Sequence, residues 1–143
     1  MPRRTALITG ASAGLGVEFA HQLAARGIDL VLVARREDRL KEVAREISAR
    51  SGVRVECFAA DLARRAAPAE IEAFARDHDL AIDYLINNAG IAGPSLLDDR
   101  DWDEQADFFE LMMISIAQLC HRFIPAMRER GFGRVVNVAS FAG

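Results

Sequence analysis

Two hydrophobic periods alternate along the chain. Apolar runs of strand length recur, and the run Leu30–Ala34 is continuous rather than alternating, which is typical of a strand covered on both faces. These runs predict strands over Thr5–Thr9, Leu30–Ala34, Val53–Ala59, Tyr84–Ile86 and Val135–Val138.

Between these runs, apolar residues recur three and four positions apart, which indicates amphipathic helices. Strand and helix in regular alternation predict an α/β fold, with a parallel sheet and helices on both of its faces. We interpret residues 1–143 as a single domain. The first predicted helix has Leu15, Phe19 and Leu23 on one stripe and ends before Gly27, and the second has Leu40, Val43, Ala44 and Ile47 and ends before Gly52. The third begins at Pro68. The fourth runs from about Trp102 towards Arg130, and Pro125 should kink it.

A glycine-rich turn, TGASAGLG over residues 9–16, lies between the first strand and the first helix. Such a turn directs free backbone N–H groups and the positive end of a helix at one point, which favours a phosphate. Gly10 would permit the tight turn, Gly14 the approach of a pyrophosphate, and Gly16 close packing of the helix. The alternative is a glycine-rich turn without a ligand.

Composition narrows the function further. The formal net charge is −3, which gives no electrostatic reason to expect nucleic acid. The longest apolar stretch, Leu111–Cys120, is well short of the roughly 20 residues that span a bilayer. Neither the cysteines nor the histidines show metal-ligand spacing, so we expect no metal site and interpret the chain as a cytoplasmic protein with reduced thiols.

Three motifs, each at the end of a predicted strand, resemble those of the short-chain dehydrogenase/reductase family. They are Thr9-Gly10 with Gly14 and Gly16, then Asn87-Asn88-Ala89-Gly90, then Asn137-Val138-Ala139-Ser140. The resemblance covers essentially the whole chain. It implies a Rossmann-like doubly wound sheet and a dinucleotide held by Gly10, Ser12, Gly14, Leu15, Gly16, Asn88, Ala89 and Gly90.

The end of the second strand bears on which dinucleotide binds. An NAD-binding chain places Asp or Glu there to accept from the ribose 2′-hydroxyl, whereas this chain has Ala34 followed by Arg35 and Arg36. An arginine can hold a 2′-phosphate through charge-assisted hydrogen bonds. We therefore predict NADP (as NADPH) over NAD, with Arg35 on the phosphate and Arg36 near the adenine. Ala13 stands where many NADP-binding relatives carry a basic residue, and both arginines could instead be solvated.

The resemblance also assigns two residues after the third strand. Asp61 and Leu62 would line the adenine pocket, with Asp61 accepting from the adenine amino group. The alternative for Asp61 is a turn-forming role, and for Asn87 a structural role is favoured over contact with the cofactor.

In the family, a serine holds the substrate oxygen, a tyrosine acts as general acid/base, and a lysine lowers the pKa of the tyrosine. Ser140 matches the serine, and the alternative for it is a strand-end residue that satisfies the local backbone. The Tyr-x-x-x-Lys segment is absent, and neither Tyr84, Lys41 nor Phe141 can replace it. The family's asparagine in the fourth helix, which holds a relay water, falls at about Met112.

By resemblance the chain is an N-terminal fragment, incomplete at its C-terminus, of an NADP-dependent oxidoreductase that interconverts a small-molecule carbonyl and an alcohol. By itself it should be inactive. The alternative is a non-catalytic NADP-binding module or regulator. The resemblance further implies a homo-oligomer formed through the helix at 102–130.

Overall fold

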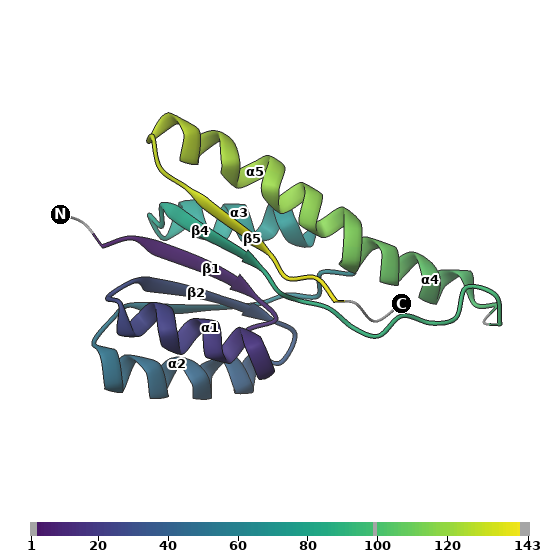
Figure 1. Ribbon diagram of the computed structural model, residues 1–143, viewed down its shortest axis with the longest axis horizontal. Coiled ribbons are helices and arrows are strands. Elements are labelled where there is room, and N and C mark those ends of the chain that lie inside the picture. The colour runs from purple at the N-terminus through teal and green to yellow at the C-terminus, as the bar shows by residue number, and fades with distance from the viewer. Residues whose placement is uncertain (1–2, 99, 141–143) are drawn as a thin grey trace.

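The computed structural model describes residues 3–98 and 100–140 of the chain (Figure 1). Its strands form one parallel sheet in the order β3-β2-β1-β4-β5. The predicted α/β class is therefore confirmed. In chain order the elements are β1 (Thr5–Thr9), α1 (Gly14–Ala25), β2 (Asp29–Ala34), α2 (Glu37–Ser51), β3 (Val55–Ala59), α3 (Ala67–Asp77), β4 (Ile82–Asn87), α4 (Trp102–Phe109), the π-helical turn η1 (Glu110–Ile114), α5 (Ser115–Glu129) and β5 (Arg134–Asn137).

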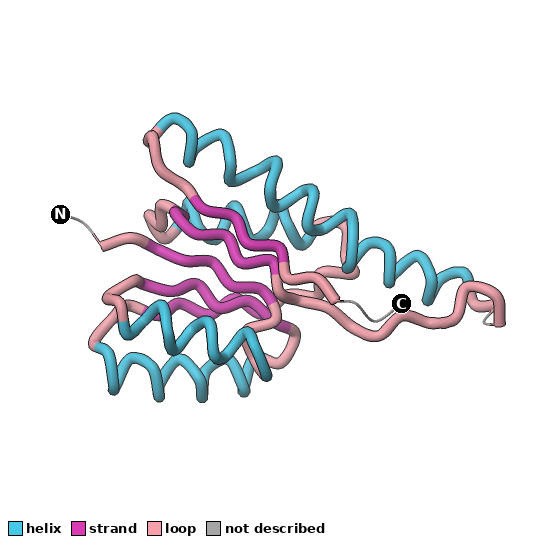
Figure 2. Tube along the Cα trace, in the orientation of Figure 1, coloured by secondary structure: helices cyan, strands magenta, loops and turns pink. Residues whose placement is uncertain are grey.

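The sheet lies between two helical layers, with α1 and α2 on one face and α3 and α5 on the other (Figures 1 and 2). Successive side chains of a strand point to opposite faces, so each central strand serves both cores. In β1, Ile8 packs with α1 and α2, whereas Leu7 packs with α3 and α5. This explains why the central strands are continuously apolar rather than alternating.

The predicted strands are found, β1 with the predicted bounds and the other four with shifted ends. β2 and β4 extend beyond their apolar runs to Asp29 and Asn87, and β5 runs one residue earlier than predicted. β3 begins at Val55 instead of Val53, because its parallel register with β2 starts at the pair Leu30 and Val55. Pairing with neighbouring strands, rather than hydrophobicity alone, decides where these strands end.

The predicted buried stripe of the first helix is wrong by one position. Leu15 is 62% exposed, and the buried residues of α1 are Gly16, Ala20 and Ala24. Small side chains allow the helix to lie close to the sheet, while Phe19 and Leu23 pack at the edges of the contact. The large apolar side chains therefore flank the contact instead of making it.

The last predicted helix is interrupted, but not at Pro125 as predicted. α5 continues through Pro125 to Glu129, and the irregularity is the π turn η1. There the Ser115 N–H donates to the carbonyl of Glu110, five residues back, and the buried Ser115 hydroxyl donates to the carbonyl of Leu111 at 2.7 Å. The hydroxyl thus supplies a partner within the turn where the regular bonding pattern is broken.

Candidate functional site

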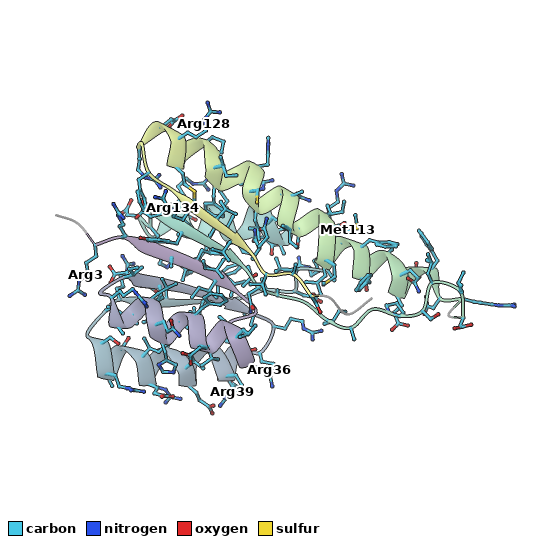
Figure 3. All side chains as sticks on the ribbon, viewed as in Figure 1. Arg3, Arg36, Arg39, Met113, Arg128 and Arg134 are labelled. Atoms are coloured by element: carbon cyan, nitrogen blue, oxygen red, sulfur yellow. The ribbon has the colours of Figure 1, made fainter. Side chains whose placement is uncertain are left out.

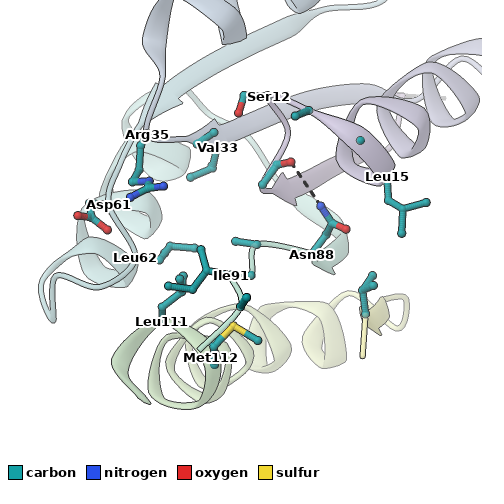
Figure 4. A pocket seen from close by; sticks show the side chains of 18 of the residues that line it. Ser12, Leu15, Val33, Arg35, Asp61, Leu62, Asn88, Ile91, Leu111 and Met112 are labelled. Atoms are coloured by element: carbon teal, nitrogen blue, oxygen red, sulfur yellow. Dashed lines mark hydrogen bonds between the residues drawn. The ribbon is translucent and has the colours of Figure 1, made fainter. Parts of the chain in front are cut away.

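A cavity of about 900 Å³ opens at the edge of the sheet where all five strands end (Figure 4). Its lining includes the residues that follow β1, β2, β3, β4 and β5. Between β1 and β4 the strand order changes direction, since β2 and β3 lie to one side and β4 and β5 to the other. Ligands of open α/β sheets bind at this kind of crevice.

The glycine-rich turn is shaped by two close approaches and one open position. Gly10 has a φ of 66°, and a Cβ there would lie 2.9 Å from the Ala89 Cα. A Cβ on Gly16 would lie 2.1 Å from the Gly10 carbonyl oxygen. Gly14 has a φ of 55° with nothing within 4 Å of its missing Cβ, and it lines the cavity. The turn therefore packs tightly on the protein side and stays open on the cavity side.

The N-terminus of α1 is built differently from those of α2 and α4. Asp101 caps α4 by accepting from the backbone N–H groups of Asp103 and Glu104, and α2 carries Glu37 and Asp38 in its first turn. α1 begins after Ala13, with no side-chain cap and no acidic residue in its first turn. Its first N–H groups therefore have no side-chain acceptor from a capping residue and lie beside the cavity.

Hydrogen bonds join the end of β1 to the end of β4. The Thr9 hydroxyl accepts from the backbone N–H groups of Asn88 and Ala89, both at 3.0 Å. The Asn88 side-chain amide donates to the Thr9 carbonyl at 3.1 Å and to the Gly10 carbonyl at 3.4 Å. These contacts hold the glycine-rich turn against the second motif, and the dashed line in Figure 4 marks one of the hydrogen bonds of the Asn88 side chain.

We predict that the substitution Thr9→Val lowers the free energy of unfolding by about 1–3 kcal/mol, because it removes the acceptor of two backbone N–H groups at a site that is 1% exposed. Urea unfolding of the purified chain measures this loss. Thr9→Ser keeps the hydroxyl and should lose less. Equal losses for the two variants would contradict this, because they would show that the methyl group of Thr9 contributes as much to stability as its hydroxyl.

Three charged side chains line the outer part of the cavity. Arg35 and Arg36 follow β2 and are exposed, and Arg36 donates to the Ser12 hydroxyl at 3.4 Å. Asp61 accepts from the backbone N–H of Ala63 at 3.0 Å, so it forms the turn after β3 while also lining the cavity. Figure 4 shows Arg35 and Asp61 in the same part of the site. The cavity thus has a cationic rim at the end of β2.

The structure brings nearly all of the candidate residues together. Eleven of the twelve predicted cofactor residues line the cavity, and so does Ser140. The exception is Gly16, which packs behind the turn. Sequence reasoning missed Phe108 and Leu111 of α4 and η1, because no motif marks them, whereas it had noted Met112 as the position of the family's asparagine. The additional lining residues are Ala13, Val33, Ala34, Ala60, Ile91, Ala92, Gly93, Phe108, Leu111, Met112, Val138 and Ala139.

Tyr84 and Lys41 lie away from the cavity. The Tyr84 hydroxyl accepts from Arg4 at 3.4 Å and its ring meets the edge of Phe132. Lys41 pairs with Glu37 on α2, and the Glu37 carboxylate that accepts its hydrogen bond raises the pKa of the Lys41 ammonium. Neither side chain can exchange a proton with a ligand in the cavity. Phe141 lies outside the described residues.

Asn87 has the structural position favoured from its sequence. It is 2% exposed, and its amide donates to Asn137 Oδ1 at 2.8 Å and to Cys120 Sγ at 3.6 Å. The Val138 N–H donates to the Asn87 carbonyl at 2.9 Å. Asn87 therefore ties the end of β5, which leads to Ser140, to the end of β4.

Metal centres and membrane-spanning helices are two other functional features that residues 3–98 and 100–140 could contain. No group of three or more His, Cys, Asp or Glu side chains there is arranged to hold a metal ion. None of the helices in this part of the chain combines the length and the apolar character needed to cross a membrane.

A cavity at the strand ends, with a glycine-rich turn and an uncapped helix, defines a dinucleotide-binding type of α/β domain. The family model described as short chain dehydrogenase matches residues 4–143. The chain therefore belongs to the short-chain dehydrogenase family, as its motifs indicated.

Individual proteins agree with this assignment. A very-long-chain 3-oxoacyl-CoA reductase of Mycosarcoma maydis is 36% identical, with 96% of this chain and 40% of that protein covered. A solved short-chain dehydrogenase of Sphingobium yanoikuyae in complex with NADPH is 38% identical with a TM-score of 0.89, covering 96% of this chain and 54% of that one. The solved L-sorbose reductase of Gluconobacter frateurii in complex with NADPH and L-sorbose is 33% identical with a TM-score of 0.90. The match covers 99% of this chain and 54% of that one. The chain thus spans about half the length of these proteins.

Proposed function

We propose that this chain binds NADPH as the cofactor-binding part of an oxidoreductase that reduces a small-molecule carbonyl or oxidises the corresponding alcohol. The observation that carries the proposal is the open cradle at Gly14 beside the uncapped N-terminus of α1, facing a cavity rimmed by Arg35 and Arg36. NADPH-bound relatives with the same fold support it.

The residues present fit a dinucleotide phosphate. The pyrophosphate would lie at Gly14 and Leu15, where backbone N–H groups meet it and no Cβ fills the space. Arg35 would hold the 2′-phosphate, while Arg36, Asp61 and Leu62 would border the adenine. Asn88, Ala89 and Gly90 would run along the ribose.

The cofactor preference is part of the proposal. No carboxylate ends β2 to accept from a ribose 2′-hydroxyl, and two guanidinium groups follow it instead. A 2′-phosphate gains charge-assisted hydrogen bonds there, whereas NADH has no group to use them.

Fluorescence titration of the purified chain with NADPH and with NADH tests both parts. Saturable binding with tighter affinity for NADPH is expected. Equal affinity for the two cofactors would remove the preference, and binding of neither would overturn the proposed function.

Bound NADPH supplies a hydride, and the proposal assigns Ser140 to hold the substrate oxygen as charge develops on it. The general acid/base and its lysine have no counterpart among the described residues that line the cavity. Binding and turnover are therefore separate tests. A chain that binds NADPH but reduces no carbonyl by itself would fit both a part of an enzyme and a non-catalytic NADP-binding regulator. Activity of a longer protein that contains this chain would distinguish them.

Partners and location complete the proposal. α4 and η1 carry an outward apolar stripe that includes Trp102, Phe109 and Met113, and Trp102 and Met113 are 64% and 60% exposed. Figure 3 shows Met113 on the side of α4 and η1 that is away from the sheet. We infer that two copies pair through this stripe.

We also propose a cytoplasmic location, because Cys57 and Cys120 are free thiols.

Analytical ultracentrifugation tests the pairing of copies. The substitution Met113→Glu places a charge in the stripe and is expected to shift a dimer to monomer. Leu97→Glu is the matched control, because Leu97 is 92% exposed and lies in the loop before α4. If the unsubstituted chain is monomeric at high concentration, or if both variants dissociate equally, the stripe does not pair copies.

A further inference from the structure

The cavity continues past the dinucleotide residues toward α4 and η1. This second part is formed by Ile91, Gly93, Phe108, Leu111, Met112 and Val138, which we call the apolar wall. Figure 4 shows Ile91, Leu111 and Met112 grouped on one side of the site, across from the glycine-rich turn.

Two glycines bring the loop after β4 against this helix. A Cβ on Gly93 would lie 2.7 Å from the Phe108 ring, and a Cβ on Gly90 would lie 3.4 Å from Met112 Sδ and Cε. Phe108 and Met112 are four residues apart, so both project from the same side of the helix. The wall is therefore a packed surface, and larger side chains at Gly93 would displace it.

The π turn determines which side chains belong to the wall. Leu111 and Met112 line the cavity, whereas Met113, the next residue, is 60% exposed on the outside. Ser115 stabilises this arrangement through its 2.7 Å hydrogen bond to the Leu111 carbonyl. Two adjacent methionines thus lie in opposite environments, which makes them a matched pair for experiment.

The chemistry of the wall selects one kind of ligand. None of its five side chains carries a charge, an amide or a hydroxyl, and the neighbouring polar group on the β5 side is Ser140. A polyhydroxy compound that moved from water to this wall would lose the hydrogen bonds of its hydroxyls to water and find no partners to replace them. An alkyl chain loses nothing and gains from leaving water.

We propose that the apolar wall binds the alkyl arm of the carbonyl substrate, so that the chain selects apolar ketones over polyhydroxy ketones such as sugars. The assignment of this ligand as the substrate rests on the proposed function, because it places the carbonyl near Ser140 and the hydride donor. The apolar character of the site stands on the lining residues alone.

Methyl NMR of the NADPH-saturated chain labelled with ¹³C in its methionine methyl groups tests this proposal. The described methionines are Met112, Met113 and Met127, the last being buried in the core at 4% exposure. Titration with 2-undecanone is expected to shift the Met112 methyl signal and to leave the other two in place. L-sorbose at the same concentration is expected to shift none of them.

The variants Met112→Ser and Met113→Ser make the same chemical change inside and outside the wall. The first should weaken 2-undecanone binding about fivefold, and the second should change it less than about twofold. An equal shift of Met112 by L-sorbose, or equal affinities of the two variants, would overturn the proposal. NADPH binding is measured beforehand, so a chain that binds 2-undecanone but no NADPH would overturn the proposed function and leave the apolar site intact.

Discussion

Replacing Arg35 with alanine is expected to weaken NADPH binding about 10- to 100-fold while changing NADH binding less than about twofold. A charge-assisted hydrogen bond contributes about 1.5–3 kcal/mol, which corresponds to this range. Arg35 lines the cavity from the end of β2, where only a 2′-phosphate would use its guanidinium group. Fluorescence titrations of both cofactors at one fixed salt concentration provide the two dissociation constants.

Arg39→Ala is the matched control for charge. It removes one positive charge nearby, but Arg39 pairs with Glu42 on α2 and does not line the cavity. NADPH affinity should stay within about twofold, because exposed charges at a distance are screened by salt. If Arg39→Ala and Arg35→Ala weaken binding equally, the effect is general electrostatic attraction and Arg35 makes no specific contact.

Replacing Gly16 with alanine is expected to lower the free energy of unfolding by about 3 kcal/mol or more and to abolish NADPH binding. The new Cβ would lie 2.1 Å from the Gly10 carbonyl oxygen, and a backbone atom cannot move aside as a flexible side chain can. To avoid this clash, the start of α1 must move away from Gly10, which would displace the N–H groups proposed to meet the pyrophosphate. Urea unfolding and cofactor titration measure the two effects.

Gly27→Ala separates this steric effect from backbone conformation. Gly27 has a φ of 76° and nothing within 4 Å of its missing Cβ, so alanine there meets only the cost of a left-handed conformation, roughly 1–2 kcal/mol. NADPH binding by the folded variant should be unchanged. If the Gly16 and Gly27 variants lose comparable free energies of unfolding, the glycine-rich turn relaxes around a side chain at Gly16.

Local sequence patterns were sufficient for the class of fold and for most of the candidate site. Continuous apolar runs such as Leu30–Ala34 exist because each strand contacts two cores, and this requirement is visible without coordinates. The motifs at residues 9–16 and 87–90 and the arginines after β2 follow strand ends, and in a parallel sheet those ends meet at one edge. Predicted residues far apart in sequence therefore line one cavity.

Tertiary packing decided the features that local patterns misplaced. Leu15 has the spacing of a core residue, yet the close approach of α1 to the sheet admits only Gly16, Ala20 and Ala24. Pro125 predicted the break in the last helix, but the helix departs from α geometry at η1, where Ser115 supplies a hydrogen bond.

The sequence by itself thus determined the alternation of strands and helices, the parallel sheet and the motifs at its edge, because these depend on periodicity and on residues adjacent in the chain. Only the tertiary structure decided that Phe108, Leu111 and Met112 face the cavity while Met113 faces away. The physical reason is that a π turn changes the direction of side chains through its own hydrogen bonds and through packing on Gly90 and Gly93, and neither leaves a periodic signal.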